Sequence, residues 1–453
     1  MQTKHGFQSS DNRSLIAATL FMAQFLYIWV TTDPYIAEST SIMSDAGSNP
    51  LNQLAAISLF CGMLWFVLTS PVKVLVLQPR FLMIGLLVCL ALTAMASETP
   101  LISLKQMILA VILLVNASVF LLLPRSEEQF ARMIGIGLLI MLGFAYFGVV
   151  FKPLQAIHQY TAELGIDQVG NWRGHFTHKN VASAAMLISS CVGLYLKDKG
   201  FKLTGWLIVG LSAFFLVHTG GKTSTAMLPL ILLIAYVFEK FSLLRVPIAV
   251  CGVVAINFFT VGAALIPSVY RFIESLGVDA SFTNRDDIWQ FAARAIMERP
   301  LLGYGLYGFW RTDKLINNDT VESWAPTAFN GHNAWIDTMI NFGAIGFILM
   351  AVWILVLPLI YINQIFKGNA YSPVVRLYIR IWLYGLYASA LESVFFESGS
   401  LLWFCIMVAI FGLRLQAVAV PLTETANMIG YNPSVNAQNN IRWGGNAKME
   451  TLG

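Results

Sequence analysis

The sequence contains little charge. Asp, Glu, Lys and Arg make up 11% of its 453 residues, whereas an ordinary soluble domain carries about 25%. A chain with 57% hydrophobic residues cannot cover a globular surface with polar groups, which excludes a soluble enzyme. The net charge of +4 is small and dispersed, so no nucleic-acid partner is expected. The remaining class is an all-α polytopic membrane protein, with membrane lipids around it.

Cysteine is scarce as well. The five cysteines, Cys61, Cys89, Cys191, Cys251 and Cys405, all lie inside apolar runs. They are typical of small residues facing lipid or the core, and they form neither a disulfide framework nor a zinc motif with histidine. No outer cluster of carboxylates has the pattern of a divalent-metal site. We therefore expect no metal and no other cofactor.

Long apolar runs are abundant. A membrane-spanning helix needs about 20 apolar residues, and runs of roughly this length, bounded by charge or proline, predict about 12 transmembrane helices. No small-residue cleavage site follows the first run, which indicates a retained helix and not a signal peptide. The runs lie near 14–31, 51–70, 80–97, 103–123, 130–151, 180–196, 203–219, 224–238, 246–267, 334–361, 375–396 and 399–416.

The distribution of Lys and Arg predicts the orientation. Most of them fall in loops on one side if the N-terminus is cytoplasmic, as the positive-inside rule requires. Both termini are then cytoplasmic, and segments 152–179 and 268–333 lie outside. The second is long enough to indicate a functional loop, and it is partly helical because Arg285 to Met297 is amphipathic. The predicted units are therefore helices within 1–267, a periplasmic loop 268–333, helices within 334–416 and a disordered tail 417–453.

The first outer segment gathers cationic side chains next to a helix start. Arg173, His175, His178 and Lys179 lie within one short stretch, and Asn180 follows. The N-terminus of the next helix favours an anion. The alternative is a cluster that snorkels to the membrane interface, with Trp172 as a belt residue.

Lys222 follows two glycines in a sequence similar to a phosphate-binding P-loop. The first glycine of that motif is missing, however, because Leu216 occupies its place. Lys222 is therefore either a single outer cation that contacts a ligand or part of a plain turn.

The long outer loop adds further candidates, chiefly Arg285, Arg294 and His332. Taken singly, each is as well explained by a solvated or capping residue. Together with the first cluster they give the pattern expected of a site that grips a lipid-linked phosphate. Glu392, near the outer end of the eleventh run, is either functional or an interface residue that pairs with an outer cation.

These segments resemble a known family. Three of them are similar to the O-antigen ligase and polymerase (Wzy-C) superfamily. They are Arg173 to Asn180, Arg299 to Gly305 with Phe309-Trp310, and His332-Asn333 followed by Gly343 and Gly346. The nearest likeness is to exopolysaccharide polymerases of the ExoQ type. Related proteins often have Thr-Gly-Arg where this chain has Thr283-Asn284-Arg285.

Two spacings fit different members of the superfamily. Arg294 precedes Gly305 by the spacing of the polymerase Arg-x10-Gly pattern. His332 precedes Gly343 by the same spacing, as in the ligase His-x10-Gly pattern. The sequence therefore does not choose between the two activities.

The resemblance implies a metal-independent glycosyltransferase with a GT-C-like fold in the bacterial inner membrane, with its site facing the periplasm. It would move a glycan from a polyprenyl diphosphate to an acceptor hydroxyl with inversion. His332 would accept or orient the acceptor proton, with Glu392 as the alternative. The diphosphate would be bound by Arg173, Lys179, Lys222, Arg285 and Arg294. Sugars would be held by His178, Asn180, Trp310 and Asn333.

Two rival functions remain open at this point. A ligase would use the same chemistry but pass the finished glycan to lipid A core. A flippase or other transporter is of a different class, and its charges are expected near the membrane midplane in broken helices. The predicted spans are almost free of charge in their interiors, which favours glycan transfer.

Overall fold

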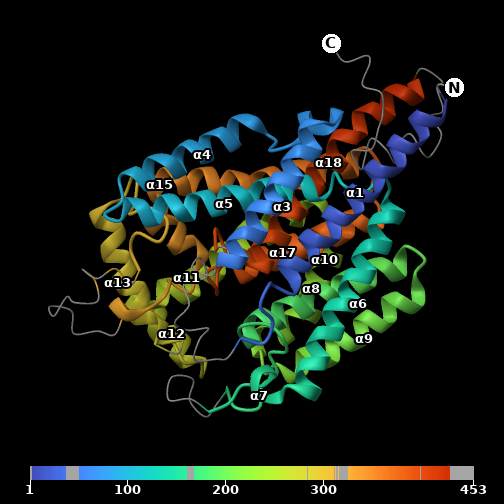
Figure 1. The fold of residues 1–453 in the computed structure, drawn as a ribbon. Helices are drawn as coiled ribbons and strands as arrows, with labels where there is room; N and C mark the ends of the chain where they lie inside the picture. The colour runs from blue at the N-terminus through green and yellow to red at the C-terminus, as the bar shows by residue number, and fades with distance from the viewer. Residues whose placement is uncertain are drawn as a thin grey trace.

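The computed structural model describes residues 3–36, 50–160, 168–282, 284–310, 312, 315, 325–397 and 399–428. Side chains are described for these residues except 3–11, 71, 222, 223 and 419–428. The described chain is a bundle of helices (Figure 1) without a named strand, and an isolated β-bridge joins Ile157 to Trp172. The predicted all-α class is therefore confirmed.

Each predicted apolar run coincides with one helix or with two or three consecutive helices. Seven helical stretches within the described ranges are long and apolar enough to cross a membrane, so the protein is a multi-pass membrane protein. The count of about twelve spans and the GT-C-like fold stay predictions. The main helices are α1 (Thr3–Trp29), α3 (Pro50–Leu68), α4 (Arg80–Met95), α5 (Pro100–Phe120), α6 (Glu127–Phe151), α8 (Lys179–Asp198), α9 (Lys202–His218), α10 (Lys222–Lys240), α11 (Gly252–Leu265), α15 (Ala334–Ala351), α16 (Leu357–Lys367), α17 (Pro373–Ala388) and α18 (Leu401–Met428).

Shorter elements connect these helices. Helix α13 matches the amphipathic helix expected in the long loop, and with α12 it lies at one end of the bundle (Figure 1). Helix α18 continues into the segment expected to be a disordered tail, and residues 429–453 lie outside the described residues. The short elements are η1 (Pro71–Leu75), α7 (Pro153–Ala156), η3 (Ser242–Leu244), η4 (Pro247–Cys251), α12 (Pro267–Ser275), α13 (Arg285–Glu298), η5 (Ala325–Thr327) and η6 (Val352–Val356).

Helices α8 and α18 form the centre of the bundle. Within their apolar windows 78% and 83% of the residues are buried, against 22% for α3. The backbones of α8 and α9 are in direct contact at Gly193 and Gly205. A Cβ on Gly205 would lie 2.6 Å from the carbonyl oxygen of Gly193, which leaves no room for a side chain. Small residues allow such close crossings inside a membrane. The central position of α8 fixes its first residues, which carry part of the candidate site.

Helix α15 is broken, and a segment of the long loop fills the break. Gly343 has a φ of 61° and a ψ of −164°, which lie outside the helical range. Tyr304 N donates to Ile340 O (2.8 Å), Gly305 N donates to Asn341 O (2.9 Å), and Ala344 N donates to Pro300 O (2.8 Å). The loop thus pairs backbone groups that a helix break leaves without partners, as burial in a membrane protein requires.

The Arg294–Gly305 and His332–Gly343 spacings noted in the sequence both end at this junction. Gly305 has a φ of 85°, and a Cβ on Gly343 would lie 2.2 Å from the carbonyl carbon of Leu301. Only glycine fits such a backbone conformation at so close a contact. The two glycines therefore have a direct role in docking the segment that follows α13 onto α15.

We expect the Gly343→Ala substitution to destabilise the protein by about 2–5 kcal/mol, because it combines a Gly-only backbone conformation with overpacking. Gly210→Ala is the matched control, since Gly210 lies inside α9 with no atom within 4 Å of its added Cβ. That substitution should be neutral or stabilise by up to about 1 kcal/mol. Thermal unfolding of both purified variants in detergent, followed by tryptophan fluorescence, tests this. Equal midpoints would contradict the docking role of Gly343.

Candidate functional site

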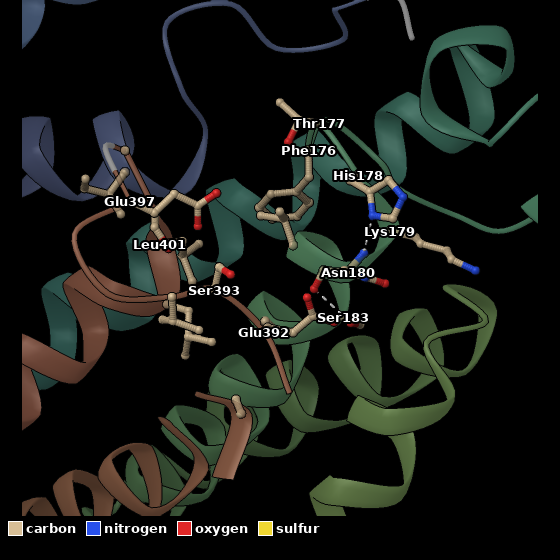
Figure 2. Close-up of a pocket in the computed structure, with 18 of the residues that line it drawn as sticks. Phe176, Thr177, His178, Lys179, Asn180, Ser183, Glu392, Ser393, Glu397 and Leu401 are labelled. Carbon is tan, nitrogen blue, oxygen red and sulfur yellow. Dashed lines mark hydrogen bonds between the residues drawn. The ribbon is translucent and has the colours of Figure 1, made fainter. Parts of the chain in front are cut away.

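A large cavity lies where the first residues of α8, α10 and α13 meet the loop between α17 and α18 (Figure 2). Its volume is about 1740 Å³. Its apolar wall includes Ile28 of α1, Leu109 of α5 and Leu402 of α18. Its polar wall includes Lys179, Arg285, His332, Glu392 and Glu397.

Three of the predicted site residues meet in this cavity, although they come from separate segments. Arg285 begins α13, His332 precedes α15, and Glu392 follows α17. Glu392 lies between the other two: its Oε1 is 3.4 Å from Arg285 Nη2, and its Oε2 is 3.6 Å from His332 Nδ1. Enclosure by protein raises the pKa of the Glu392 carboxyl, but the neighbouring His332 side chain and the charge of Arg285 outweigh it. The net pKa of Glu392 lies below its usual range, so this carboxyl is ionised at neutral pH.

The turn before Arg285 accounts for the asparagine at position 284. Asn284 has a φ of 65°, in the left-handed region where glycine is most at ease and asparagine is the best tolerated alternative. Asparagine can therefore form the turn that the resemblance led us to expect with glycine. The Arg285 guanidinium is then held by Leu391 O, which accepts from Nη1 at 2.6 Å.

Asn333 holds the segment around His332 in place. Its Oδ1 accepts from Trp335 N (3.0 Å) and Ile336 N (3.1 Å), so it caps α15. Its Nδ2 donates to Ala390 O (2.9 Å) and Asn257 Oδ1 (2.7 Å). Asn333 is fully buried and is not part of the cavity wall, so its contacts are those of a positioning residue, unlike the sugar contact that we predicted.

Asp337, which the sequence analysis missed, joins three segments behind the cavity. Its Oδ1 accepts from Trp310 Nε1 and from Gly331 N, both at 2.9 Å. Its Oδ2 accepts from Ser393 Oγ. The carboxylate thus fixes the neighbours of both His332 and Glu392. An acidic residue in the first turn of an apolar helix was the available signal.

Arg173 and His175 lie in the interior of the protein. Arg173 is 1% exposed, and its guanidinium donates to the carbonyl oxygens of Ile36 (2.9 Å), Thr177 (3.0 Å) and Phe176 (3.3 Å). His175 Nε2 lies 2.8 Å from Trp29 O, and burial lowers the pKa of this imidazole to about 4, so it is neutral at physiological pH. These two residues hold the segment just before α8 in shape and are not part of the cavity wall.

Lys179, Asn180 and His178 do line the cavity. The first backbone N–H groups of α8 already have partners, because His158 Nε2 accepts from Lys179 N (3.1 Å) and His178 Nδ1 accepts from Asn180 N (3.2 Å). Figure 2 shows the Lys179 side chain extending away from Glu392 and Glu397. At the start of α8, the groups available to a ligand are therefore the Lys179 ammonium and the Asn180 amide, since these two backbone N–H groups are already bonded. The contribution of His158 was not predicted from the sequence.

The other predicted residues lie elsewhere. Arg294 is exposed on α13 outside the cavity. Trp310 is engaged with Asp337 and is not among the residues that line the cavity. Lys222 is the first residue of α10, and its side chain lies outside the described residues. Within the described ranges no group of three or more His, Cys, Asp or Glu has the arrangement of a metal site.

Comparison with known proteins agrees with the predicted superfamily. Residues 207–351 match the family model described as O-antigen ligase; this range includes Arg285 and His332. Two proteins named "Putative polysaccharide ligase" are similar to the chain. One, from Rickettsia conorii, is 26% identical over 228 residues, which cover 43% of this chain and 53% of the relative. The other, from Rickettsia felis, is 27% identical over 224 residues, which cover 41% and 52%.

The predicted resemblance to the O-antigen ligase and polymerase superfamily is thereby confirmed. The match spans about half the length of each of these relatives. The nearer likeness to ExoQ-type polymerases stays a prediction.

We expect Asp337→Leu to destabilise the protein by about 3 kcal/mol, because the buried Gly331 N–H and the half-buried Trp310 and Ser393 donors lose their acceptor at about 1–3 kcal/mol each. Asp337→Asn should retain most of the stability, since the amide oxygen still accepts from Trp310 and Gly331 and the amide NH₂ can donate to Ser393 Oγ. Thermal unfolding in detergent compares the two. An Asn variant as unstable as the Leu variant would mean that the charge of Asp337, and not its hydrogen bonds, is what matters.

Proposed function

We propose that the protein is a membrane glycosyltransferase that moves a polyprenyl-diphosphate-linked glycan to an acceptor sugar hydroxyl with inversion. The observation that carries this proposal is the meeting of Arg285, Glu392 and His332 in one large cavity. Two of the three lie within the range similar to O-antigen ligases. The site would face the periplasm of a bacterial inner membrane, with both chain termini in the cytoplasm.

The size and lining of the cavity support this substrate class. Its volume of about 1740 Å³ exceeds the roughly 300–1,000 Å³ of pockets for small molecules. It combines an apolar wall from α1 and α5 with amide, hydroxyl and charged side chains at the start of α8. Such a lining suits a lipid-linked diphosphate that carries several sugars.

Arg285 is the best-placed group for the diphosphate. Its guanidinium is preorganised by Leu391 O and Glu392, and a fixed cation stabilises the negative charge that develops on the leaving group. Lys179 and Lys222 are proposed as further cations. Arg173 and Arg294 are set aside, because the first is occupied by backbone carbonyls and the second lies outside the cavity.

His332 is proposed to accept or to orient the proton of the acceptor hydroxyl. It lines the cavity beside Glu392, which meets the usual requirement that such a group be oriented by a neighbour. His178 and Asn180 are proposed to contact sugar hydroxyls. The fixed protein cations would supply the leaving-group stabilisation that a metal provides in other glycosyltransferases, so we propose that no metal is needed.

Extension of an exopolysaccharide or O-antigen chain is the proposed reaction, and transfer to lipid A core is the alternative. The names of the two relatives favour the alternative. The two activities share donor and chemistry and differ in the acceptor.

We expect Arg285→Gln to reduce glycan transfer about 10²–10³-fold, because one fixed donor to the leaving group is lost. The control is Arg294→Gln on the same helix, which should change the rate by no more than about twofold. The assay uses purified protein in EDTA with a polyprenyl-diphosphate-linked repeat unit, and resolves the products by size.

The products distinguish the candidate functions. A ladder of longer lipid-linked glycans would establish a polymerase. Transfer only after lipid A core is supplied would establish a ligase. Folded wild-type protein that transfers glycan to neither acceptor would overturn the proposal, and equal losses in both arginine variants would remove Arg285 from the site.

A further inference from the structure

Glu397 is a carboxylate of the cavity that neither the sequence motifs nor the family match singles out. It lies in the loop between α17 and α18, and it is exposed to the cavity. Figure 2 shows its carboxylate directed into the cavity, across from Phe176 and the start of α8. It therefore faces the space that the glycan would occupy.

The loop presents Glu397 rigidly. Phe396, the residue before it, has a φ of 59°, a conformation that costs free energy for a bulky side chain and persists only where its surroundings enforce it. Its ring packs on Phe342 of α15 (5.1 Å between centroids) and on Trp403 of α18 (5.5 Å). Gly399, with a φ of 77°, reverses the chain on the other side. The buried aromatic thus fixes the direction in which Glu397 projects.

The two glutamates of the cavity differ in their partners. Glu392 is flanked by Arg285 and His332. Glu397 forms no ion pair with any described residue, and its carboxylate interacts with the hydroxyl of Ser400. A carboxylate whose lone pairs face the substrate space without a cation beside them can accept a proton, whereas an arginine beside a carboxylate favours its ionised form.

We propose that Glu397 is the catalytic base, which removes the proton from the acceptor hydroxyl during glycan transfer. This inference rests on the proposed function. The hydroxyl oxygen forms its bond to the anomeric carbon while its O–H electron pair remains on it, and the proton passes to Glu397. The bond from the anomeric carbon to the diphosphate breaks, its electron pair leaves with the diphosphate beside Arg285, and Glu397 later releases the proton to water.

Electrostatics favour proton uptake at this position. Enclosure by protein raises the pKa of the Glu397 carboxyl to about 7, assisted by the negative charges of Glu392 and Asp337 and opposed by the Ser400 hydroxyl. A base is most effective when its pKa lies near the working pH. Other titratable groups reach the cavity from the end of α1, from α8, from α13 and from the loop before α15: Asp33, His178, Lys179, Arg285 and His332.

This assignment resolves the role of His332. With Glu397 as the proton acceptor, the imidazole that is paired with Glu392 orients the reactants. The two residues should therefore have different pH signatures when each is replaced.

The test compares wild type with Glu397→Gln, Glu397→Asp and His332→Gln in the glycan-transfer assay between pH 5 and 9. Glu397→Gln should lower the maximal rate about 10²–10⁴-fold, while donor affinity changes by less than about threefold because the diphosphate contacts remain. The wild-type rate should fall as pH drops below about 7, because Glu397 becomes protonated. That fall should be absent from Glu397→Gln, partly restored in Glu397→Asp and retained in His332→Gln.

Each contrary result has a distinct meaning. Wild-type protein that transfers no glycan defeats the proposed function itself. Wild-type transfer with a Glu397→Gln variant that keeps the rate and the acid limb overturns only the base assignment, as does loss of the acid limb in His332→Gln. Glu128→Gln, at an exposed ion pair with Arg132, serves as the control and should match wild type. Unchanged thermal unfolding of Glu397→Gln excludes a folding defect.

Discussion

A backbone amide or carbonyl buried in a membrane protein needs a hydrogen-bond partner within the protein. The candidate site is built around a helix break at which the helix itself does not supply these partners. Helix α15 breaks at Gly343, and the backbone of Pro300–Gly305 completes the hydrogen bonds on both sides of the break. This docking ties the end of α13 to the middle of α15. Helix α13, which begins with Arg285, and helix α15, which follows His332, are thereby fixed relative to each other.

Two carboxylates, Glu392 and Asp337, hold the side chains of the site in place. Glu392 lies between Arg285 and His332 and contacts both of them. Asp337 holds the chain on both sides of this arrangement through Trp310, Gly331 and Ser393. Preorganised charges of this kind do not need to rearrange when negative charge develops on a leaving group. The carboxylates are therefore as much a part of the site as the cations.

The sequence was sufficient for features that depend on composition or on local pattern. Apolar runs located the helices, and Arg285, His332 and Glu392 could be found as ionisable residues next to helix ends. What the sequence could not reveal was the use of each side chain. Arg173 and Lys179 lie six residues apart in one basic segment, yet packing buries the first against backbone carbonyls and leaves the second at the cavity. Asp337 joins Trp310 and Ser393, which lie 27 and 56 residues away in the chain, and no local pattern reveals such contacts.

The opposite end of the bundle bears on the choice between transfer and transport. Helix α8 begins at the cavity and ends at Asp198, where Arg376 of α17 contacts both Asp198 (3.2 Å) and Glu239 of α10 (3.4 Å). Tyr371 donates to the same Glu239. These contacts join α8, α10 and α17 at the end away from the site. A transporter has to open both ends in turn, whereas an enzyme whose donor and acceptor arrive from one side needs only one opening. A cavity at one end and an ion-pair network across the other therefore fit glycan transfer better than transport.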